Sequence, residues 1–455
     1  MAISSVLVAN RGEIAVRIIR SCVALGVRTV QVYSDVDVNS LAVKIADKAV
    51  NIGPSPAAKS YLDQRKIIDA ALTEGVDAIH PGYGFLAENP DFVDAVVSAG
   101  LIFIGPSASS IRVLGNKVSA RELVQSIGVP TAPGSDAILK SIEEAVELSE
   151  EIGYPLMLKA TAGGGGRGIR IINDVIELRS MYPQASAEAK AAFGNGSLYL
   201  EKFIANARHI EVQILGDGVR CVHLGERDCS LQRRRQKLWE EAPSLIPRAV
   251  RDLLCESAVR ICETVSYKGA GTVEFLYDAV SEKYYFLEVN TRIQVEHPVS
   301  EMVTGVDIVK EMILICGGDV LAYGQSDIRV RGHAIECRIN AEDPSKDFLP
   351  WPGIIDSLFI PEGDGIRFDS MLYEGCVVPP FYDSLLGKLI VWAPTREECL
   401  SRLEEALMAL RLDGIPTTVF LHQQLVKDPH ILSGNFHIGF VEEWLLTQYP
   451  SQELQ

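Results

Sequence analysis

Residues 284–296, with the sequence YYFLEVNTRIQVE, constrain the fold of this chain more than any other stretch. Aromatic and β-branched residues favour an extended strand, in which side chains alternate between two faces. A carboxylate inside such a strand is costly to desolvate unless a cation or a hydrogen-bond network receives it. Taken alone, the segment is also compatible with a strand end that carries solvated charges. If the extended geometry runs to its end, one face carries Tyr284, Phe286, Glu288, Asn290, Arg292, Gln294 and Glu296.

A second strand is expected just before it, over residues 271–277 (GTVEFLY). The short polar connection to Tyr284 predicts an antiparallel hairpin, in which Glu274 faces Glu288 and Asn290. Opposed like charges destabilise a sheet unless something neutralises them. A divalent ion with oxygen ligands does so, and Mg²⁺ usually keeps a phosphate and waters as well. We therefore predict that Glu274, Glu288 and Asn290 hold a magnesium–nucleotide complex.

A glycine run separates two apolar stretches within residues 155–172 (PLMLKATAGGGGRGIRII). Consecutive glycines let backbone amides approach an anion, and the β-branched residues that follow predict a strand rather than the helix of a Walker loop. A hairpin that closes over phosphates is expected, with Lys159 close enough to reach them. The alternative is a flexible surface hairpin, which a lysine in an apolar strand disfavours. The predicted tip carries Gly163, Gly164, Gly165, Gly166 and Gly168.

The composition is that of a globular protein: 455 residues, of which 47% are hydrophobic and 23% charged. A formal net charge of −17 argues against nucleic acid or a membrane surface as the main partner, because both are anionic, but a local cluster of Lys and Arg can still hold a small anion. Without a bilayer-length apolar stretch or a basic leader, we expect a cytoplasmic protein. The nine cysteines form no Cys-x-x-Cys pair, which predicts reduced thiols rather than a disulfide frame or a zinc site.

Strands and helices alternate in the N-terminal third, which predicts a parallel sheet with Rossmann-like topology. Strands are expected near residues 5–9, 29–33, 77–80 and 101–104, and helices near 13–25, 247–265 and 396–410. The first strand leads into Asn10-Arg-Gly-Glu13, so the Gly-x-Gly-x-x-Gly dinucleotide fingerprint is missing. We expect three domains: a Rossmann-like domain over residues 1–130, a lid over 131–204 and a large C-terminal domain over 205–455.

Together these segments resemble ATP-grasp enzymes, and specifically the biotin carboxylase family. The resemblance runs from Val6 to about Gly439, nearly the whole chain. It rests on the glycine hairpin and on long motifs at residues 6–15 (VLVANRGEIA), 80–89 (HPGYGFLAEN), 115–118 (GNKV), 226–230 (ERDCS), 288–298 (EVNTRIQVEHP) and 331–343 (RGHAIECRINAED).

The resemblance implies an α/β and α+β ATP-grasp fold, in which a Rossmann-like parallel sheet, a small mobile lid and a C-terminal mixed domain enclose a nucleotide cleft. It also implies a homodimer. In this family ATP activates bicarbonate as carboxyphosphate, and the carboxyl group then passes to N1 of biotin on a carrier protein. The implied cofactors are ATP and Mg²⁺, with Mn²⁺ as an alternative ion, and biotin is a carried substrate.

The resemblance also implies a role for each matching residue. Lys117, Lys159 and Lys237 would neutralise phosphates, as the charge of ATP demands. Glu201, Lys202 and Ile204 at the lid hinge would hold the adenine. The rest of the nucleotide pocket would be lined by His209, Gln232 and, more weakly, Arg235.

The chemistry would fall to a second set of residues. Arg292, Gln294 and the backbone of Val295 would bind bicarbonate, whose planar shape matches a guanidinium group. Glu296 would be the base that deprotonates bicarbonate, and Arg338 would stabilise the negative charge on the ureido oxygen of biotin.

Two residues depart from the family pattern. Arg235 stands in Gln232-Arg-Arg-Arg-Gln-Lys237 where a histidine is usual, and Trp239 replaces a smaller aliphatic residue. Arginine still donates hydrogen bonds but adds a permanent charge and accepts no proton. We interpret the chain as a divergent relative that serves a particular carboxylase.

The sequence contains no biotinylation motif resembling Met-Lys-Met, so we expect the biotin carboxyl carrier protein and the carboxyltransferase to be separate chains. The expected system is an acetyl-CoA or related acyl-CoA carboxylase of fatty acid biosynthesis. Three alternatives remain: a component of a urea, pyruvate or other 2-oxo-acid carboxylase, a different ATP-grasp carboxylate–amine ligase, or a non-catalytic nucleotide-binding scaffold.

Overall fold

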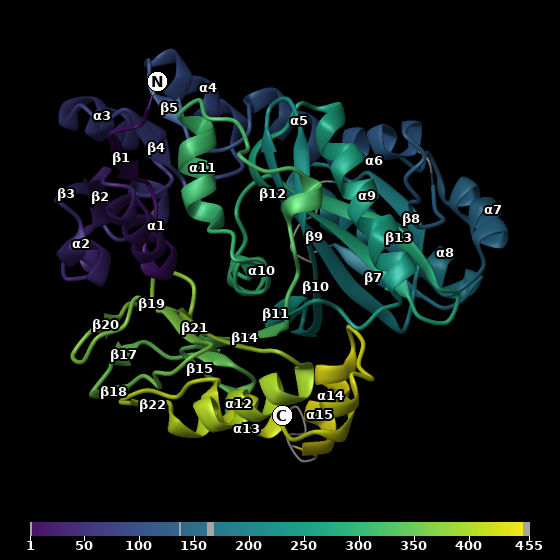
Figure 1. Ribbon diagram of the computed structural model, residues 1–455. Coiled ribbons are helices and arrows are strands. Elements are labelled where there is room, and N and C mark those ends of the chain that lie inside the picture. Colours follow the sequence, from purple (N-terminus) through teal and green to yellow (C-terminus); the bar gives the residue numbers. More distant parts are fainter. Residues whose placement is uncertain (1, 136–137, 162–167, 449–455) are drawn as a thin grey trace.

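The structure is a computed structural model that describes residues 2–135, 138–161 and 168–448. Its N-terminal unit comprises β1 (Ser5–Val8), α1 (Gly12–Ala24), β2 (Arg28–Ser34), η1 (Asp35–Asp37), α2 (Leu41–Ile45), β3 (Lys48–Gly53), η2 (Ala57–Lys59), α3 (Gln64–Glu74), β4 (Ala78–His80), α4 (Pro90–Ser98), β5 (Ile102–Phe103), α5 (Ala108–Gly115) and α6 (Lys117–Ser126). The five strands form a parallel sheet in the order β3-β2-β1-β4-β5 (Figure 1). This confirms the predicted parallel sheet, to which β3 adds a strand that was not expected.

The next unit comprises α7 (Ile142–Ile152), β6 (Leu156–Ala160), β7 (Ile169–Ile172), α8 (Val175–Phe193) and β8 (Leu198–Lys202). Strands β6 and β7 pair antiparallel on either side of the glycine run, as predicted, and β8 adds a third strand on the other edge of β6. Gly163, Gly164, Gly165 and Gly166 lie outside the described residues. A small core of its own, which includes Leu156, Leu158 and Leu200, holds the unit together.

The remaining chain begins with β9 (Ala207–Asp217), β10 (Cys221–Arg233), β11 (Gln236–Ala242), α9 (Arg248–Thr264), β12 (Lys268–Asp278), β13 (Lys283–Asn290), α10 (His297–Thr304) and α11 (Ile308–Cys316). It continues with η3 (Gln325–Asp327), β14 (His333–Asn340), β15 (Glu342–Asp343), η4 (Pro344–Lys346), β16 (Leu349–Pro350), β17 (Gly353–Ile354), β18 (Ser357–Phe359), β19 (Ile366–Ser370), β20 (Val377–Val378), β21 (Leu385–Ala393), α12 (Arg396–Ala409), β22 (Arg411–Asp413), α13 (Val419–Leu425), α14 (Pro429–Ser433) and α15 (Phe440–Gln448).

One antiparallel sheet of eight strands, in the order β13-β12-β9-β10-β11-β14-β21-β19, runs through this whole region. Helix α9 packs on one face, where Ile210, Val212 and Ile214 of β9 join a buried cluster with Leu254 and Ala258 of α9. Helix α10 contacts the strands β10, β11 and β14. Because side chains alternate along a strand, the residues between the apolar ones point away from α9.

A bulge in β13 changes which of its residues share a face. Glu288 pairs with Glu274, but Phe286 pairs with Phe275. Strand β13 therefore has one extra residue between two consecutive pairs. Phe286 therefore lies in the core with Phe275, and the prediction that it shares a face with Glu288 is wrong. The strand also ends at Asn290, so the extended geometry does not continue to Glu296 as expected.

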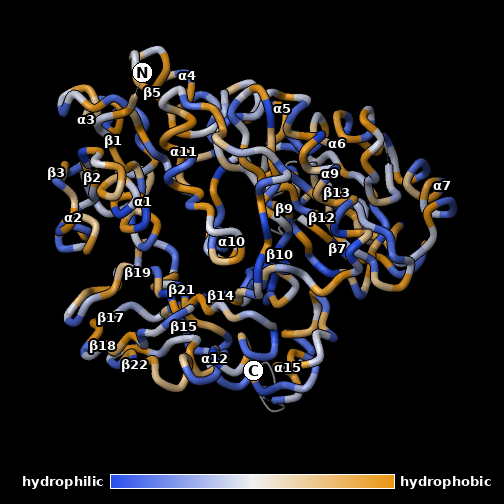
Figure 2. Tube along the Cα trace, viewed as in Figure 1, coloured by the Kyte–Doolittle hydropathy of each residue, from blue (hydrophilic) through white to orange (hydrophobic). Residues whose placement is uncertain are grey.

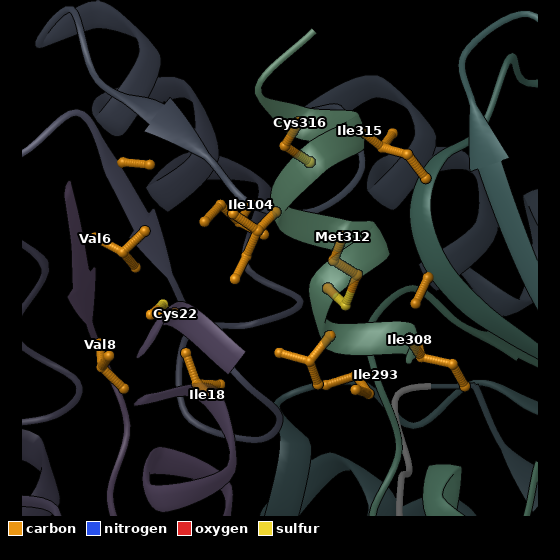
Figure 3. Packing of buried hydrophobic residues seen from close by; sticks show 14 of the residues in the cluster. Val6, Val8, Ile18, Cys22, Ile104, Ile293, Ile308, Met312, Ile315 and Cys316 are labelled. Atoms are coloured by element: carbon orange, nitrogen blue, oxygen red, sulfur yellow. The ribbon is translucent and has the colours of Figure 1, made fainter. Parts of the chain in front are cut away.

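Helix α11 joins the N-terminal sheet to the eight-stranded sheet. Figure 3 shows Ile308, Met312 and Ile315 of this helix in one cluster with Val6 and Val8 of β1. Figure 2 shows the apolar course of α11 and a hydrophilic stretch along β10, a strand that contributes to the candidate site. Burial of this cluster fixes the N-terminal unit against the sheet.

All nine cysteines are free thiols, and all are buried. Burial raises the pKa of several of them, Cys229 among them, well above the usual value. The free, buried thiols agree with the prediction of reduced cysteines. Among the described residues, no helix combines the length and the apolar character that a membrane crossing requires.

Candidate active site

Polar residues line the face of the eight-stranded sheet that points away from α9. On β9, His209, Glu211 and Gln213 alternate with the apolar residues of the core face. Glu211 pairs in register with Glu274 on β12 and with Arg227 on β10. Each of these side chains is buried, so its charge or dipole must be met by a neighbour.

Lys237, on β11, is the centre of this polar face. Its Nζ donates to Glu211 (2.6 Å), Glu274 (3.0 Å), Gln294 (3.3 Å) and Glu296 (2.6 Å). Burial opposes the charged ammonium, but the three carboxylates outweigh burial and raise the pKa of Lys237 well above its usual value. The structure thus places a permanent positive charge among three acidic side chains.

Glu296, directly before α10, lies between two cations. Its carboxylate accepts from Lys237 and, through its other oxygen, from Arg338 at 3.0 Å. Burial favours the neutral acid, but the charges of Lys237 and Arg338 outweigh it and hold the pKa of Glu296 well below its usual range. The carboxylate is therefore ionised and matched by charge.

Arg338, on β14, also bonds Glu240 on the neighbouring strand, with Nε 2.6 Å from Oε1. Burial raises the pKa of Glu240 to about 7 in spite of this pair. Glu336, the register partner of Glu240, is completely buried, and burial raises its pKa well above the usual value. Burial thus favours the neutral form of Glu336, which lies beside the Arg338 pair.

Glu274 and Glu288 face each other across the β12–β13 hairpin, as predicted. Burial raises the pKa of Glu288, and the negative charge of Glu274 raises it further. A divalent ion between the two carboxylates would relieve this repulsion. Glu274 already has partners, because His209 Nε2 lies at 2.9 Å and the amide of Asn290 donates to it at 2.9 Å. Burial acts to raise the pKa of Glu274, but the charges of Lys237 and His209 act to lower it. The two charges outweigh burial, and the pKa of Glu274 lies well below its usual value.

The loop of residues 291–296 carries the predicted bicarbonate contacts. Arg292 bonds Glu88 through Nε at 2.9 Å and the amide oxygen of Asn290 through a terminal nitrogen at 3.0 Å. Gln294 donates to Glu274 at 3.0 Å. A chain of hydrogen bonds therefore links the predicted metal ligands to the predicted anion site.

A second group of predicted residues gathers at the lid hinge. Glu201 forms ion pairs with Lys159, which is buried on β6, and with Arg121 at 3.0 Å. The ammonium of Lys202 donates to the carbonyls of residues 153 and 154, and Ile204 follows two residues after it. The connection from the N-terminal unit passes beside β8. It does so closely at Gly134, where a side-chain Cβ would lie only 2.4 Å from the carbonyl oxygen of Leu200 and would clash with it.

The other predicted nucleotide residues surround these groups. Lys117 is exposed at the start of α6, and its charge acts to lower the pKa of Glu288. Gln232 is buried on β10 and donates to the carbonyl of Cys229 at 3.3 Å. Gly168 precedes β7 with a φ of 78°, which a residue with a side chain adopts only with strain.

The two departures from the family pattern lie on β11 and on the turn before it. Arg234 and Arg235 form the two-residue turn between β10 and β11, with φ values of 47° and 67°. The backbone N–H of Arg234 bonds Glu442 of α15 at 2.7 Å, which docks the turn on the C-terminal helices. Trp239 is 1% exposed and packs in the cluster of Leu231 and Leu421, so a large side chain is accommodated there.

Several site residues were missed by sequence reasoning. Glu211 could have been found, because it stands between Ile210 and Val212 along a strand, whereas Arg227 lies between two charged residues, Glu226 and Asp228, and shows no such alternation. Glu88, Glu240, Glu13 and Lys388 act through partners far away in the sequence, and no local pattern signals such a pairing.

Comparisons with known proteins cover almost the whole chain. The family model "Biotin carboxylase, N-terminal domain" matches residues 2–111. The model "Carbamoyl-phosphate synthase L chain, ATP binding domain" matches residues 116–323, and "Biotin carboxylase C-terminal domain" matches residues 336–443.

Among similar proteins, the biotin carboxylase of Nostoc sp. is 51% identical over 97% of this chain and 99% of its own length. A crystal structure of a biotin carboxylase–β,γ-ATP complex from Campylobacter jejuni has a TM-score of 0.93 and 45% identity, covering 97% of this chain and 99% of that one. The biotin carboxylase domain dimer of the Hydrogenobacter thermophilus 2-oxoglutarate carboxylase, solved with MgADP, ADP and bicarbonate, has a TM-score of 0.93 and 48% identity over 100% of both chains.

Proposed function

Because this chain belongs to the biotin carboxylase family and is an ATP-grasp ligase, we propose that it carboxylates biotin on a separate biotin carboxyl carrier protein, using bicarbonate and MgATP. ATP would activate bicarbonate as carboxyphosphate, and the carboxyl group would pass to N1 of biotin. The observation that carries this proposal is the group around Lys237, in which one partly buried ammonium meets Glu274, Gln294 and Glu296.

Magnesium fits the carboxylates of the β12–β13 hairpin. Glu274 and Glu288 would hold it, since their opposed charges call for a cation, and the metal would supply charge neutralisation for the phosphates. Asn290 offers an amide oxygen, which accepts from Arg292 in the present arrangement. Mn²⁺ takes similar oxygen ligands and is the alternative ion.

Glu296 would act as the base once Lys237 has another partner. A carboxylate whose pKa is held low by two cations is a poor proton acceptor. When Lys237 turns to the phosphates of ATP, it withdraws part of its charge from Glu296, so the pKa of Glu296 rises toward its usual value. Nucleotide binding would thereby switch on the base that accepts the proton of bicarbonate.

Arg338 would receive the negative charge that develops on the ureido oxygen of biotin. Its guanidinium is already held by Glu240 and Glu296, so it is oriented before substrate arrives. Arg292, Gln294 and the backbone of Val295 would bind the bicarbonate anion beside Glu296. Lys117, Lys159, Glu201, Lys202, Ile204, His209 and Gln232 would form the nucleotide pocket, with Arg235 at its edge.

The deciding experiment follows phosphate release from MgATP by the purified protein with free biotin. We expect release only when bicarbonate and biotin are both present. Release that does not depend on bicarbonate would favour another carboxylate–amine ligase. Nucleotide binding that raises thermal stability without any turnover would favour the scaffold alternative.

The final acceptor of the carboxyl group is set by a partner chain. A carrier and a carboxyltransferase of an acyl-CoA system are the first candidate, as expected from the sequence. A 2-oxo-acid system is the second candidate, because the 2-oxoglutarate carboxylase domain is 48% identical over the full length. Proteins that co-purify with the chain from its own cells distinguish the two: an acyl-CoA carboxyltransferase supports the first and a 2-oxo-acid transferase the second.

A further inference from the structure

Lys388, on β21, is a completely buried lysine outside the set predicted from the sequence. Its Nζ donates to the backbone carbonyl of Val295 at 2.7 Å and lies 3.2 Å from Oε2 of Glu13. The side chains of Lys388 and Glu13 are 0% and 1% exposed. A charge so deep in the protein needs a counter-charge and hydrogen-bond acceptors, and these two contacts supply them.

The carbonyl that Lys388 holds belongs to the loop of residues 291–296, which has no strand partner along its length. Val295 stands between Gln294 and Glu296, and both of those side chains contact Lys237. The next carbonyl back, that of Gln294, lies 2.7 Å from Nδ1 of His297, which is also buried. Two successive carbonyls of the loop are thus held by buried side chains.

A fixed carbonyl constrains more than one atom. Because the peptide unit is planar, the bond to Val295 also fixes the N–H and Cα of Glu296. The direction in which the Glu296 side chain leaves the backbone then follows, and so does its reach to Lys237 and Arg338. Release of the carbonyl would let this unpaired loop rotate.

Lys388 is itself fixed from the N-terminal unit. Glu13 lies on α1, and its other oxygen accepts from the hydroxyl of Tyr83 at 2.5 Å. The contact therefore brings together helix α1, strand β21 and the loop, which lie in the regions matched by three different family models.

We propose that Lys388 is a positioning residue for bicarbonate: through the Val295 carbonyl it holds the loop of residues 291–296 in the conformation that binds the anion and aims Glu296 at it. This inference rests on the proposed function, since the bicarbonate site is part of that function. Lys388 acts through the backbone of Val295 and touches none of the reacting atoms.

The test removes both members of the buried pair. Lys388→Met alone would leave Glu13 without its counter-charge and could prevent folding for that reason. The variant of choice is therefore Lys388→Met with Glu13→Gln, which removes the lysine together with its ion-pair partner. The matched control is Lys427→Met with Glu404→Gln, which removes an exposed lysine–glutamate pair 3.3 Å apart. Phosphate release is measured with bicarbonate varied at saturating ATP, and with ATP varied at saturating bicarbonate.

We expect the KM for bicarbonate to rise at least tenfold in the buried double variant, while the KM for ATP stays within twofold and the control pair behaves as wild type. An unchanged KM for bicarbonate overturns the inference. A parallel rise in both KM values also overturns it, because general loosening of the fold would act on both substrates.

If the methionine variant does not fold, Lys388→Gln with Glu13→Gln carries the same expectations, since glutamine is too short to reach Val295. Failure of the proposed function looks different from failure of this inference. A wild-type protein that releases phosphate without bicarbonate refutes the function, whereas a bicarbonate-dependent wild type with an equally competent variant refutes only the role of Lys388.

Discussion

At the scale of single residues, Glu296 shows how two neighbouring cations decide what a carboxylate can do. Lys237 and Arg338 hold its pKa well below the usual range, so it is ionised at any physiological pH. A base in that state is weak, and it gains strength only when a neighbour leaves. Under the proposed function, substrate binding and proton transfer would thereby be coupled through Lys237.

Replacing Glu296 by glutamine removes the proposed base and keeps the shape of the side chain. We expect bicarbonate-dependent phosphate release to fall by a factor of about 10²–10⁴, the usual contribution of a positioned general base. Binding of ATP, followed by the shift in thermal unfolding, should persist. Glu362→Gln, an exposed substitution, is the control. Full activity of Glu296→Gln would assign the base to another group.

Arg235 tests the departure from the family pattern. It occupies a left-handed turn position, φ 67°, that histidine also tolerates, so Arg235→His should fold as well as wild type. We expect the variant to keep bicarbonate-dependent ATP cleavage, measured by release of phosphate. Complete loss of that activity would show that the arginine itself is required.

At the scale of elements, strand β11 ties its neighbours together through Glu241. This buried carboxylate accepts from His333 of β14 at 2.7 Å and from Arg396 of α12 at 2.7 Å. Burial favours the neutral acid, but His333 and Arg396 outweigh it and lower the pKa of Glu241 from 4.5 to about 2. The folded state therefore binds the proton less readily than the unfolded chain does.

A depressed pKa of this kind contributes stability that is fully present above about pH 4.5 and is lost as the pH falls toward 2. The shift corresponds to roughly 3 kcal/mol at neutral pH. We expect Glu241→Gln to lower the free energy of unfolding by about that amount at pH 7, measured in urea. The difference in the free energy of unfolding between wild type and Glu241→Gln should become smaller as the pH falls from 5 to 3. Glu405→Gln, an exposed change on α12, the helix that carries Arg396, should show no such trend. A difference in stability that does not depend on pH would contradict the assignment.

The strands also show how far sequence reasoning reaches. The β12–β13 hairpin and the facing of Glu274 and Glu288 were predicted from alternation and turn spacing, and the structure confirms both. The bulge that moves Phe286 to the core was not, because one extra residue in a strand leaves no local mark. The loop after Asn290 was also misjudged, since it bonds Glu88 and Lys388, residues distant in sequence that no local pattern signals.

At the scale of the whole molecule, the parallel sheet and the glycine hairpin were predicted from residue patterns, whereas the ATP-grasp fold was predicted from the resemblance to a family. The single sheet of eight strands was not. It joins β11 to β14 across ninety residues of intervening chain, and pairing over such a separation depends on packing rather than on local pattern.

We expect the protein to be a homodimer, as the resemblance implies and as the dimeric 2-oxoglutarate carboxylase domain supports. Light scattering after size exclusion at micromolar concentration should give twice the mass of one chain. A concentration-independent mass of one chain would reject the dimer. Addition of MgATP is the control for whether nucleotide alters the assembly.

The burial of all nine cysteine thiols has a practical consequence. A thiol-reactive dye cannot reach the buried cysteines in the native state, but it reacts with them once the core opens. The absorbance of the labelling product over time therefore reports the opening of the fold. The rate of thiol labelling therefore measures how often the native state opens, and this rate falls when a bound ligand stabilises the native state.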